Sequence, residues 1–207
     1  MSLSLPERRR VLIRIAAARQ QPGTGSCREF LERRTCDVLW PNLSDLLGDI
    51  HWAVIGGVGT RHYMPERATR DLDIIVHHDD SRRVADALAG AGYVHVADLR
   101  IGGSAWRSED GIYVDVIESA APWVRDALVQ AMSNRDAQGL PILPLPHFSL
   151  MKFQAARAQD LADLTRMFGL ASDKQLSEVR TMFRLYEPGG LDDLESLIEL
   201  GRLETDG

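Results

Sequence analysis

The segment GGVGTRHYMPERATRDLDIIV, residues 56–76, restricts the folds open to this chain more than any other part of it. Two glycines end one apolar run, and two aspartates, Asp71 and Asp73, stand one residue apart inside the next. Side chains alternate faces along a strand, so these carboxylates share one surface while Leu72 and Ile74 point to the other. Two like charges held side by side repel each other unless a cation lies between them. The segment therefore predicts a sheet with a metal site beside a glycine turn.

A third carboxylate occurs in a later strand pattern, YVDVIE, where Asp115 stands between Val114 and Val116. If this strand pairs next to the first, Asp115 reaches the same face as Asp71 and Asp73. Oxygen ligands without histidine or cysteine suit Mg²⁺ or Mn²⁺. Three carboxylates can hold the two ions, about 3.5–4 Å apart, that serve phosphoryl displacement. We therefore predict these three aspartates to be metal ligands and catalytic residues.

The glycines predict a phosphate-binding turn. Gly56 and Gly57 end the strand run HWAVIGG and precede a short helix, VGTRHYM, so backbone N–H groups could approach phosphate oxygens with no Cβ in the way. Three arginines follow in sequence, and any of them could pair with a triphosphate: Arg61, Arg67 and Arg70. We expect Arg61 and Arg67 among the nucleotide contacts.

The surrounding pattern predicts an α/β (α+β) fold, a mixed sheet with flanking helices. Three more strands are expected, YVHVADL, GSAWRS and GIYVDVIE, and the last two are joined as a hairpin; an amphipathic helix, DSRRVADALAGAG, lies before them. N-terminal helices are expected at Leu5–Ala18, Cys27–Val38 and Asn42–Leu47, and the chain is helical again after Ala121. Prolines at 141, 144 and 146 indicate a boundary, which gives a domain at 1–145 with the N-terminal helices and a helical domain at 146–207.

One helix is expected from Pro146 to Phe168, PHFSLMKFQAARAQDLADLTRMF. On a helical wheel Arg157 falls in the apolar stripe, where Asp160 at i+3 can pair with it. Lys152 and Asp163 occupy the opposite side, so Lys152 could face a cleft.

These motifs resemble the DNA polymerase beta type nucleotidyltransferase superfamily, in which strand, Gly-Gly and short helix precede R-x-T-x-D-L-D-I and a later V-D-V strand. The nearest branch looks like the small bacterial nucleotidyltransferases that include the abortive-infection toxins. In the present chain the matched residues of the second motif are Arg67, Thr69, Asp71, Leu72, Asp73 and Ile74. The resemblance extends to a lysine and an Arg/Asp-bearing helix, matched by Lys152, Arg157, Asp160 and Asp163.

The resemblance implies transfer of a nucleoside monophosphate from an NTP to an acceptor hydroxyl. It implies Asp71 and Asp73 as ligands of Mg²⁺ or Mn²⁺, Asp115 as third ligand or general base, Gly56 and Gly57 as the phosphate turn and Lys152 as a nucleotide contact; Asp163 belongs to the same set. The chain departs from the pattern in two places: Gly57 stands where many members have a serine, and Gln159 where a Lys or Arg often precedes the helix aspartate.

Several alternatives stay open. A protein of the same fold could bind a nucleotide or a partner without catalysis, as one half of a toxin–antitoxin pair, although three intact aspartates favour an enzyme. A dinucleotide-binding fold is weakly matched by Gly57-x-Gly59 after a strand, but His62 occupies the third glycine position. His77 and His78 beside two aspartates could form a metal cluster, although a solvated turn is the commoner meaning of such a run.

Charge is unevenly distributed in a chain with a formal net charge of -6. Residues 1–70 hold 11 Lys/Arg against 7 Asp/Glu, and residues 71–207 hold 13 against 23. The basic end could meet RNA, especially a transfer RNA end; a protein hydroxyl and an aminoglycoside-type molecule are the next acceptors we consider. A solvated helix carrying Arg8, Arg9, Arg10 and Arg14 is the simpler explanation for that segment. Apolar runs are too short to span a membrane, and we expect a cytoplasmic protein.

Overall fold

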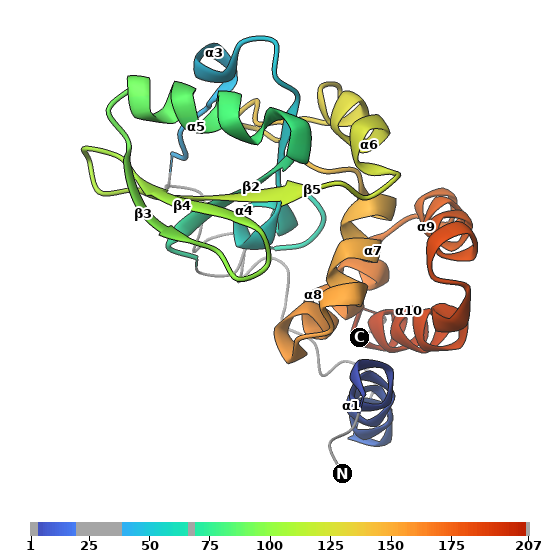
Figure 1. Ribbon diagram of the computed structural model, residues 1–207. Coiled ribbons are helices and arrows are strands. Elements are labelled where there is room, and N and C mark those ends of the chain that lie inside the picture. Colours follow the sequence, from blue (N-terminus) through green and yellow to red (C-terminus); the bar gives the residue numbers. More distant parts are fainter. Residues whose placement is uncertain (1–3, 20–38, 66–68, 206–207) are drawn as a thin grey trace. The chain divides into compact units, whose positions relative to one another are not determined.

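The computed structural model describes residues 4–19, 39–65 and 69–205 of the 207-residue chain. They form two compact units, one from the described parts of Met1–Leu31 and Leu145–Gly207, the other from those of Glu32–Pro144. Figure 1 shows the first as packed helices and the second as a sheet with helices around it. Within the described ranges, no helix has the length and apolar content that crossing a bilayer requires. The expected helix Cys27–Val38 and Arg67 lie outside the described residues.

The second unit is built on one five-stranded mixed sheet in the order β1-β2-β5-β4-β3. Strand β2 pairs antiparallel with β1 and parallel with β5, while β4 pairs antiparallel with both β5 and β3. This confirms the predicted mixed α/β class and the hairpin between the last two strands. The strands are β1 (Trp52–Val54), β2 (Asp71–His77), β3 (Val94–Asp98), β4 (Gly103–Arg107) and β5 (Tyr113–Ser119).

Short helices flank this sheet, and the alternation of apolar residues explains why. In β2 the residues Leu72, Ile74 and Val76 are fully buried and pack in one core cluster with Val84 and Leu88 of the amphipathic helix after the strand. The intervening positions of β2 therefore point to the opposite face. The helices of this unit are α3 (Ser44–Leu47), α4 (Gly56–Thr60), the short 3₁₀ turn η1 (His78–Asp80), α5 (Ser81–Gly90) and α6 (Val124–Ala131).

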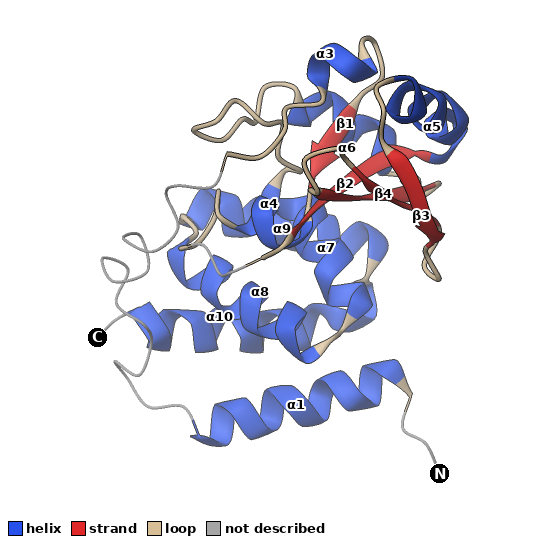
Figure 2. Ribbon diagram, turned by 90° about the vertical axis from the view of Figure 1, so that its left-hand side faces the viewer, coloured by secondary structure: helices blue, strands red, loops and turns tan. Residues whose placement is uncertain are grey.

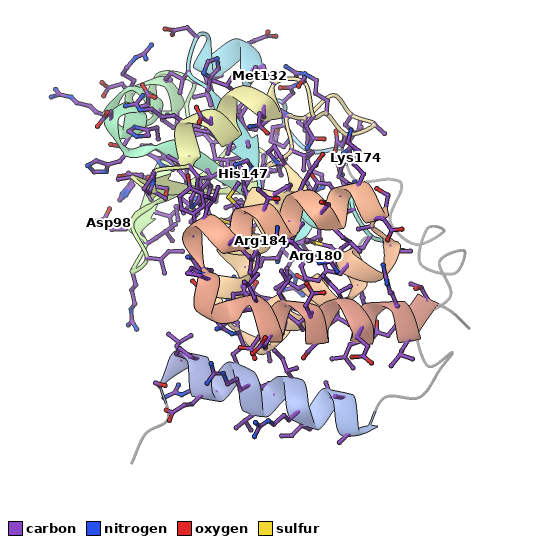
Figure 3. The ribbon with its side chains drawn as sticks, turned by 90° about the vertical axis from the view of Figure 1, so that its right-hand side faces the viewer. Asp98, Met132, His147, Lys174, Arg180 and Arg184 are labelled. Carbon is purple, nitrogen blue, oxygen red and sulfur yellow. The ribbon has the colours of Figure 1, made fainter. Side chains whose placement is uncertain are left out.

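In the first unit, every regular element among the described residues is a helix. Helices α8 and α10 cross closely because both carry glycine at the crossing point: a Cβ on Gly169 would collide with the backbone carbonyl of Gly201, and one on Gly201 with that of Thr165. Arg180, labelled in Figure 3, links α9 to α10 through two bonds to Glu195 of 2.6 and 2.7 Å. The elements are α1 (Leu5–Arg19), α7 (Leu145–Ala155), α8 (Ala158–Leu170), α9 (Asp173–Tyr186), η2 (Pro188–Gly190) and α10 (Leu191–Thr205).

Helix α1 packs with α10 in the helical unit (Figure 2), although the sequence grouped it with the N-terminal domain. Arg9 fixes it: its Nε lies 3.0 Å from Asp193, and its guanidinium stacks 3.7 Å from the centre of the Phe153 ring. Arg9 is only 4% exposed, so the expectation of a solvated arginine was wrong at this position. The division into separate domains at 145/146 stays a prediction.

The prediction of a single helix from Pro146 to Phe168 was wrong, because this segment forms two helices, α7 and α8. Ala156 takes a left-handed conformation with φ 50°, and Arg157 is extended in front of α8. Arg157 is consequently 75% exposed at its side chain and does not lie in an apolar stripe, although its expected pairing with Asp160 is confirmed at 2.6 Å.

A buried ion pair explains the break. Lys152 Nζ lies 2.8 Å from Asp163 Oδ2 and 3.2 Å from Asp160 Oδ1, and all three residues are at most 3% exposed. In a straight helix Lys152 and Asp163, 11 residues apart, would be separated by about 16 Å along the axis. Only a sharp turn between them lets one ammonium group reach both carboxylates, and an unpaired buried charge would cost several kcal/mol, roughly 3–5.

Replacing Ala156 by glycine should stabilise the protein or leave its stability unchanged. The left-handed conformation costs a non-glycine residue about 1–2 kcal/mol, which offsets the roughly 0.5–1 kcal/mol that glycine loses in backbone entropy. The matched control is Ala162→Gly in the middle of α8, expected to cost about 1 kcal/mol. Urea unfolding of both variants measures the difference, and equal destabilisation would contradict the strain assigned to residue 156.

Candidate functional site

Three aspartates meet on the face of the sheet opposite the core. The parallel pairing of β2 with β5 sets Asp73 directly beside Asp115, and Asp71 lies two residues earlier on the same face of β2. One carboxylate oxygen from each of the three lies within 4.8 Å of the others, and each residue is partly buried. Among the described residues this is the sole group of three or more acidic, His or Cys side chains spaced to hold a metal ion. The structure thus brings together the three residues that the sequence singled out.

The electrostatics of the cluster favour binding a cation. Burial raises the pKa of Asp115, and the nearby Asp71 carboxylate raises it further. A carboxyl whose pKa rises in this way is destabilised in its charged form, because it has lost water and gained a like-charged neighbour. A divalent ion at the centre of the cluster would remove that repulsion.

Gly56 and Gly57 line the approach to the carboxylates. Gly56 has φ +60°, and a Cβ there would collide with the Asp73 carboxylate. At Gly57 a Cβ would come within 2.8 Å of the Cβ of Thr69. The glycines form the first residues of α4, where the leading N–H groups of a helix have no partner within the helix. The helix thus begins at the glycines themselves, earlier than the VGTRHYM segment predicted.

Thr69 is a site residue to which the sequence assigned no role. Its hydroxyl donates a 2.8 Å hydrogen bond to Asp71 Oδ1, while its Cβ packs against Gly57. Thr69, Asp71 and Asp73 follow one another at every second position, the alternation that puts residues on one strand face. The two-residue spacing of Thr69 and Asp71 could have predicted that their side chains share a face and contact each other.

The residues present fit a hard divalent cation. All three candidate ligands are carboxylates, the donor type preferred by Mg²⁺, and oxygens on opposite sides of a Mg²⁺ ion lie about 4.2 Å apart. The spread of the three oxygens, within 4.8 Å, is close to that span. The three carboxylates could therefore hold one such ion.

The arginines near the glycine turn are placed differently. Arg61 Nε lies 2.9 Å from Asp136 Oδ2, and the pair is largely buried. Asp136 also accepts backbone hydrogen bonds from Gln138 and Leu140, so this pair ties the end of α4 to the segment after α6. A phosphate contact by Arg61 stays a prediction, as does one by Arg67, which lies outside the described residues.

Lys152 and Asp163 belong to the helical unit, where they bind each other. Gln159 Nε2 donates to the second oxygen of Asp163 at 2.8 Å, so the glutamine that departs from the family pattern supports this ion pair. The sequence predicts Lys152 on the polar side of the helix, opposite the apolar stripe. In the structure Lys152 is instead 3% exposed and paired with carboxylates. Its role as a nucleotide contact stays a prediction.

The sheet bears on two alternatives from the sequence, a dinucleotide-binding fold and a metal cluster at His77 and His78. A dinucleotide-binding unit needs parallel strands on both sides of its first helix, but β1 and β2, which flank α4, are antiparallel. His77 contacts Asp79 at 3.5 Å and His78 contacts Glu118 at 3.4 Å, so the two histidines turn to different carboxylates. Residues 77–80 at the end of β2 form a polar turn, as the sequence favoured over a metal cluster.

No protein-family model matches the chain, and no curated protein sequence matches it. Among solved structures it is similar to the antibiotic-resistance factor ANT(2'')-Ia in complex with adenylyl-2''-tobramycin, at 13% identity and a TM-score of 0.39 over 74% of this chain and 88% of that one. It is also similar to the CCA-adding enzyme (13%, TM-score 0.36, 76% and 50%) and to the Cid1 poly(U) polymerase (14%, TM-score 0.31, 82% and 56%). These TM-scores lie below 0.5, so the chemistry of the site rests on its own residues.

Replacing Gly56 by alanine should damage the site. The methyl group would collide with the Asp73 carboxylate, and φ +60° alone costs a non-glycine residue about 1–2 kcal/mol. We expect Mn²⁺ affinity, measured by titration calorimetry, to fall more than about tenfold, a loss of about 1.4 kcal/mol. The control is Gly90→Ala at the end of α5, where a Cβ meets nothing within 4 Å. Unchanged Mn²⁺ binding by the Gly56 variant would contradict this geometry.

Replacing Asp115 by asparagine should stabilise the metal-free protein at neutral pH. Because the folded-state pKa of Asp115 is raised, its contribution to stability is present below the ordinary value of 3.8 and is lost as pH rises through the raised pKa. Removing the charge should therefore raise Tm at pH 7, by an amount that shrinks as pH falls toward 3.8. Thermal unfolding in EDTA across this range measures it, and a Tm difference independent of pH would contradict the assignment.

Proposed function

We propose that the protein is a nucleotidyltransferase that transfers a nucleoside monophosphate from an NTP to an acceptor hydroxyl, with cleavage of the bond between the α- and β-phosphates and release of pyrophosphate. The observation that carries this proposal is the direct pairing of Asp73 with Asp115, with Asp71 on the same face and Gly56 against the Asp73 carboxylate. The resemblance of the diglycine and R-x-T-x-D-L-D-I motifs to the DNA polymerase beta type superfamily supports it. Carboxylates gathered beside a glycine turn suit a metal-bound triphosphate better than they suit any neutral substrate.

Each residue has a distinct task in this reaction. Asp71, Asp73 and Asp115 would hold Mg²⁺ or Mn²⁺, and two such ions would supply the positive charge that stabilises the attacking and leaving oxygens. Asp115 would be the third ligand or the general base that accepts the proton of the acceptor hydroxyl. Thr69 keeps Asp71 oriented through its hydrogen bond.

Gly56 and Gly57 would present backbone N–H groups to the phosphates at the start of α4, while their lack of a Cβ makes room for the Asp73 carboxylate and the Thr69 side chain. RNA, in particular a transfer RNA end, is the acceptor we propose first. Exposed Arg10 and Arg14 on α1 support a polyanion as partner. A role in a toxin–antitoxin pair, and contacts of Lys152 or Asp163 with the nucleotide, remain further proposals that rest on the family resemblance.

Label transfer tests the proposed function. The protein is incubated with Mg²⁺ and each of the four α-³²P-labelled NTPs in turn, against total RNA and total lysate protein as acceptors. Asp71→Ala combined with Asp73→Ala should lower transfer at least about 10³-fold, since the loss of two ligands removes the metal's contribution of several kcal/mol. Asp98→Ala, which removes an exposed aspartate of the same sheet (Figure 3), should leave transfer unchanged.

The outcomes separate the enzyme from its alternative. Label on RNA or protein that depends on the two aspartates supports the transferase. Nucleotide binding without transfer to any acceptor would support a silent binding protein of the same fold. Equal labelling by the wild type and the double variant would overturn the assignment of these aspartates.

A further inference from the structure

A pocket of about 220 Å³ lies among α1, α8 and α10 of the helical unit. Protein interiors are packed as tightly as organic crystals, and an apolar cavity of about 150 Å³ suffices to bind benzene. A pocket of this size can therefore accept a small apolar group. Its apolar lining includes Leu12 and Ile13 of α1, Leu161 and Ala162 of α8, and Leu197 and Leu200 of α10.

The contacts around the pocket keep its walls in place. Arg9 anchors α1 through its buried ion pair with Asp193, so the helix cannot simply move inward to fill the space. Gly169 and Gly201 fix the close crossing of α8 and α10, the other two walls. Small side chains at Ala16, Ala158 and Ala162 leave room where larger residues would have filled the pocket.

Two opposite charges line the same pocket. Arg166 of α8 and Glu204 of α10 both contribute to its lining, and no ion pair joins them within the described part of the chain. Burial raises the pKa of Glu204, while the positive charge of Arg166 partly counteracts this. The remaining polar residue, Thr165, already donates its hydroxyl to the Leu161 carbonyl at 2.9 Å. Arg166 is exposed and Glu204 half-buried, so both charged groups at the pocket are open to the polar end of a ligand.

We propose that this pocket binds a small zwitterion with an apolar side chain, of the class of the hydrophobic α-amino acids. The apolar lining takes the side chain, Arg166 binds the carboxylate and Glu204 binds the ammonium group. Such a ligand pairs both charges at once, whereas a simple acid or amine would pair only one. The pocket lies within the helical unit, and the proposal is independent of the nucleotidyltransferase assignment.

Calorimetry and thermal shift with the full-length protein test this site. The probes are L-phenylalanine and L-leucine, compared with 3-phenylpropionate, phenethylamine and glycine. We expect the two hydrophobic amino acids to bind with an affinity of about 1 mM or tighter. Each single-charge analogue should bind about tenfold more weakly, since a hydrogen bond to a charged group is lost. Glycine, without a side chain, should not bind.

Variants of the lining residues complete the test. Ala162→Leu fills the pocket and should abolish binding, while Arg166→Gln and Glu204→Gln should each weaken it about tenfold. Arg14→Gln and Glu199→Gln, exposed residues of α1 and α10 outside the pocket, are the matched controls. Circular dichroism and Tm of each variant show that it is folded. No binding by either amino acid, undiminished binding by Ala162→Leu, or single-charge analogues as tight as phenylalanine would each overturn the proposal.

Discussion

Repulsion among three carboxylates on one face of a sheet is the constraint around which the second unit is built. Backbone pairing of β2 with β5 holds Asp73 against Asp115, and partial burial reduces the screening of their charges by water. Such a cluster lowers the stability of the metal-free fold. The apolar alternation on the other face of the same strands, with Leu72, Ile74 and Val116 fully or almost fully buried, offsets that cost. Strands β2 and β5 therefore each have an apolar face that stabilises the fold and an acidic face whose charge repulsion destabilises it and favours metal binding.

The helical unit depends on a different balance of charges. Lys152 is 3% exposed and lies between Asp160 and Asp163, and Arg157 donates to both oxygens of Asp160, one of which it shares with Lys152. Two cations thus balance two carboxylates, and Gln159 satisfies a further oxygen. Buried ionic groups offset their desolvation cost only when their geometry is good and their hydrogen bonds are satisfied, so such a cluster adds little net stability. The left-handed residue Ala156 between α7 and α8 is part of that geometry.

Much of the sheet and its acidic cluster could be predicted from the sequence, because both follow from local alternation. The two-residue spacing of Asp71 and Asp73 indicates their common face, and the flanking valines of Asp115 indicate a neighbouring strand. The break after α7 could not be predicted in the same way. No glycine or proline marks it, and it is set by pairing of Lys152 with residues that a continuous helix would place out of reach.

The burial of Arg9 likewise could not be predicted from local sequence, because its partner lies far away in the chain. Its partner Asp193 is 184 residues away in the chain, and nothing in the basic run around it distinguishes it from its exposed neighbours. Likewise Arg61 stands next to the glycine turn in sequence, yet its partner Asp136 follows α6. Spacing indicates which side chains can share a surface of one element. It gives no information about a counter-charge that the fold brings from far along the chain.

The position of β5 in the sheet has a consequence for how the protein acquires its site. This strand lies between β2 and β4, although β3 and β4 precede it in the chain. During synthesis β2 leaves the ribosome with only two of the three carboxylates and an unpaired edge, and non-local pairing of this kind forms slowly. The acidic cluster is completed only when the last strand inserts. A nascent or misfolded chain would therefore hold a divalent ion poorly, and any chemistry at this site is reserved for molecules that have finished folding.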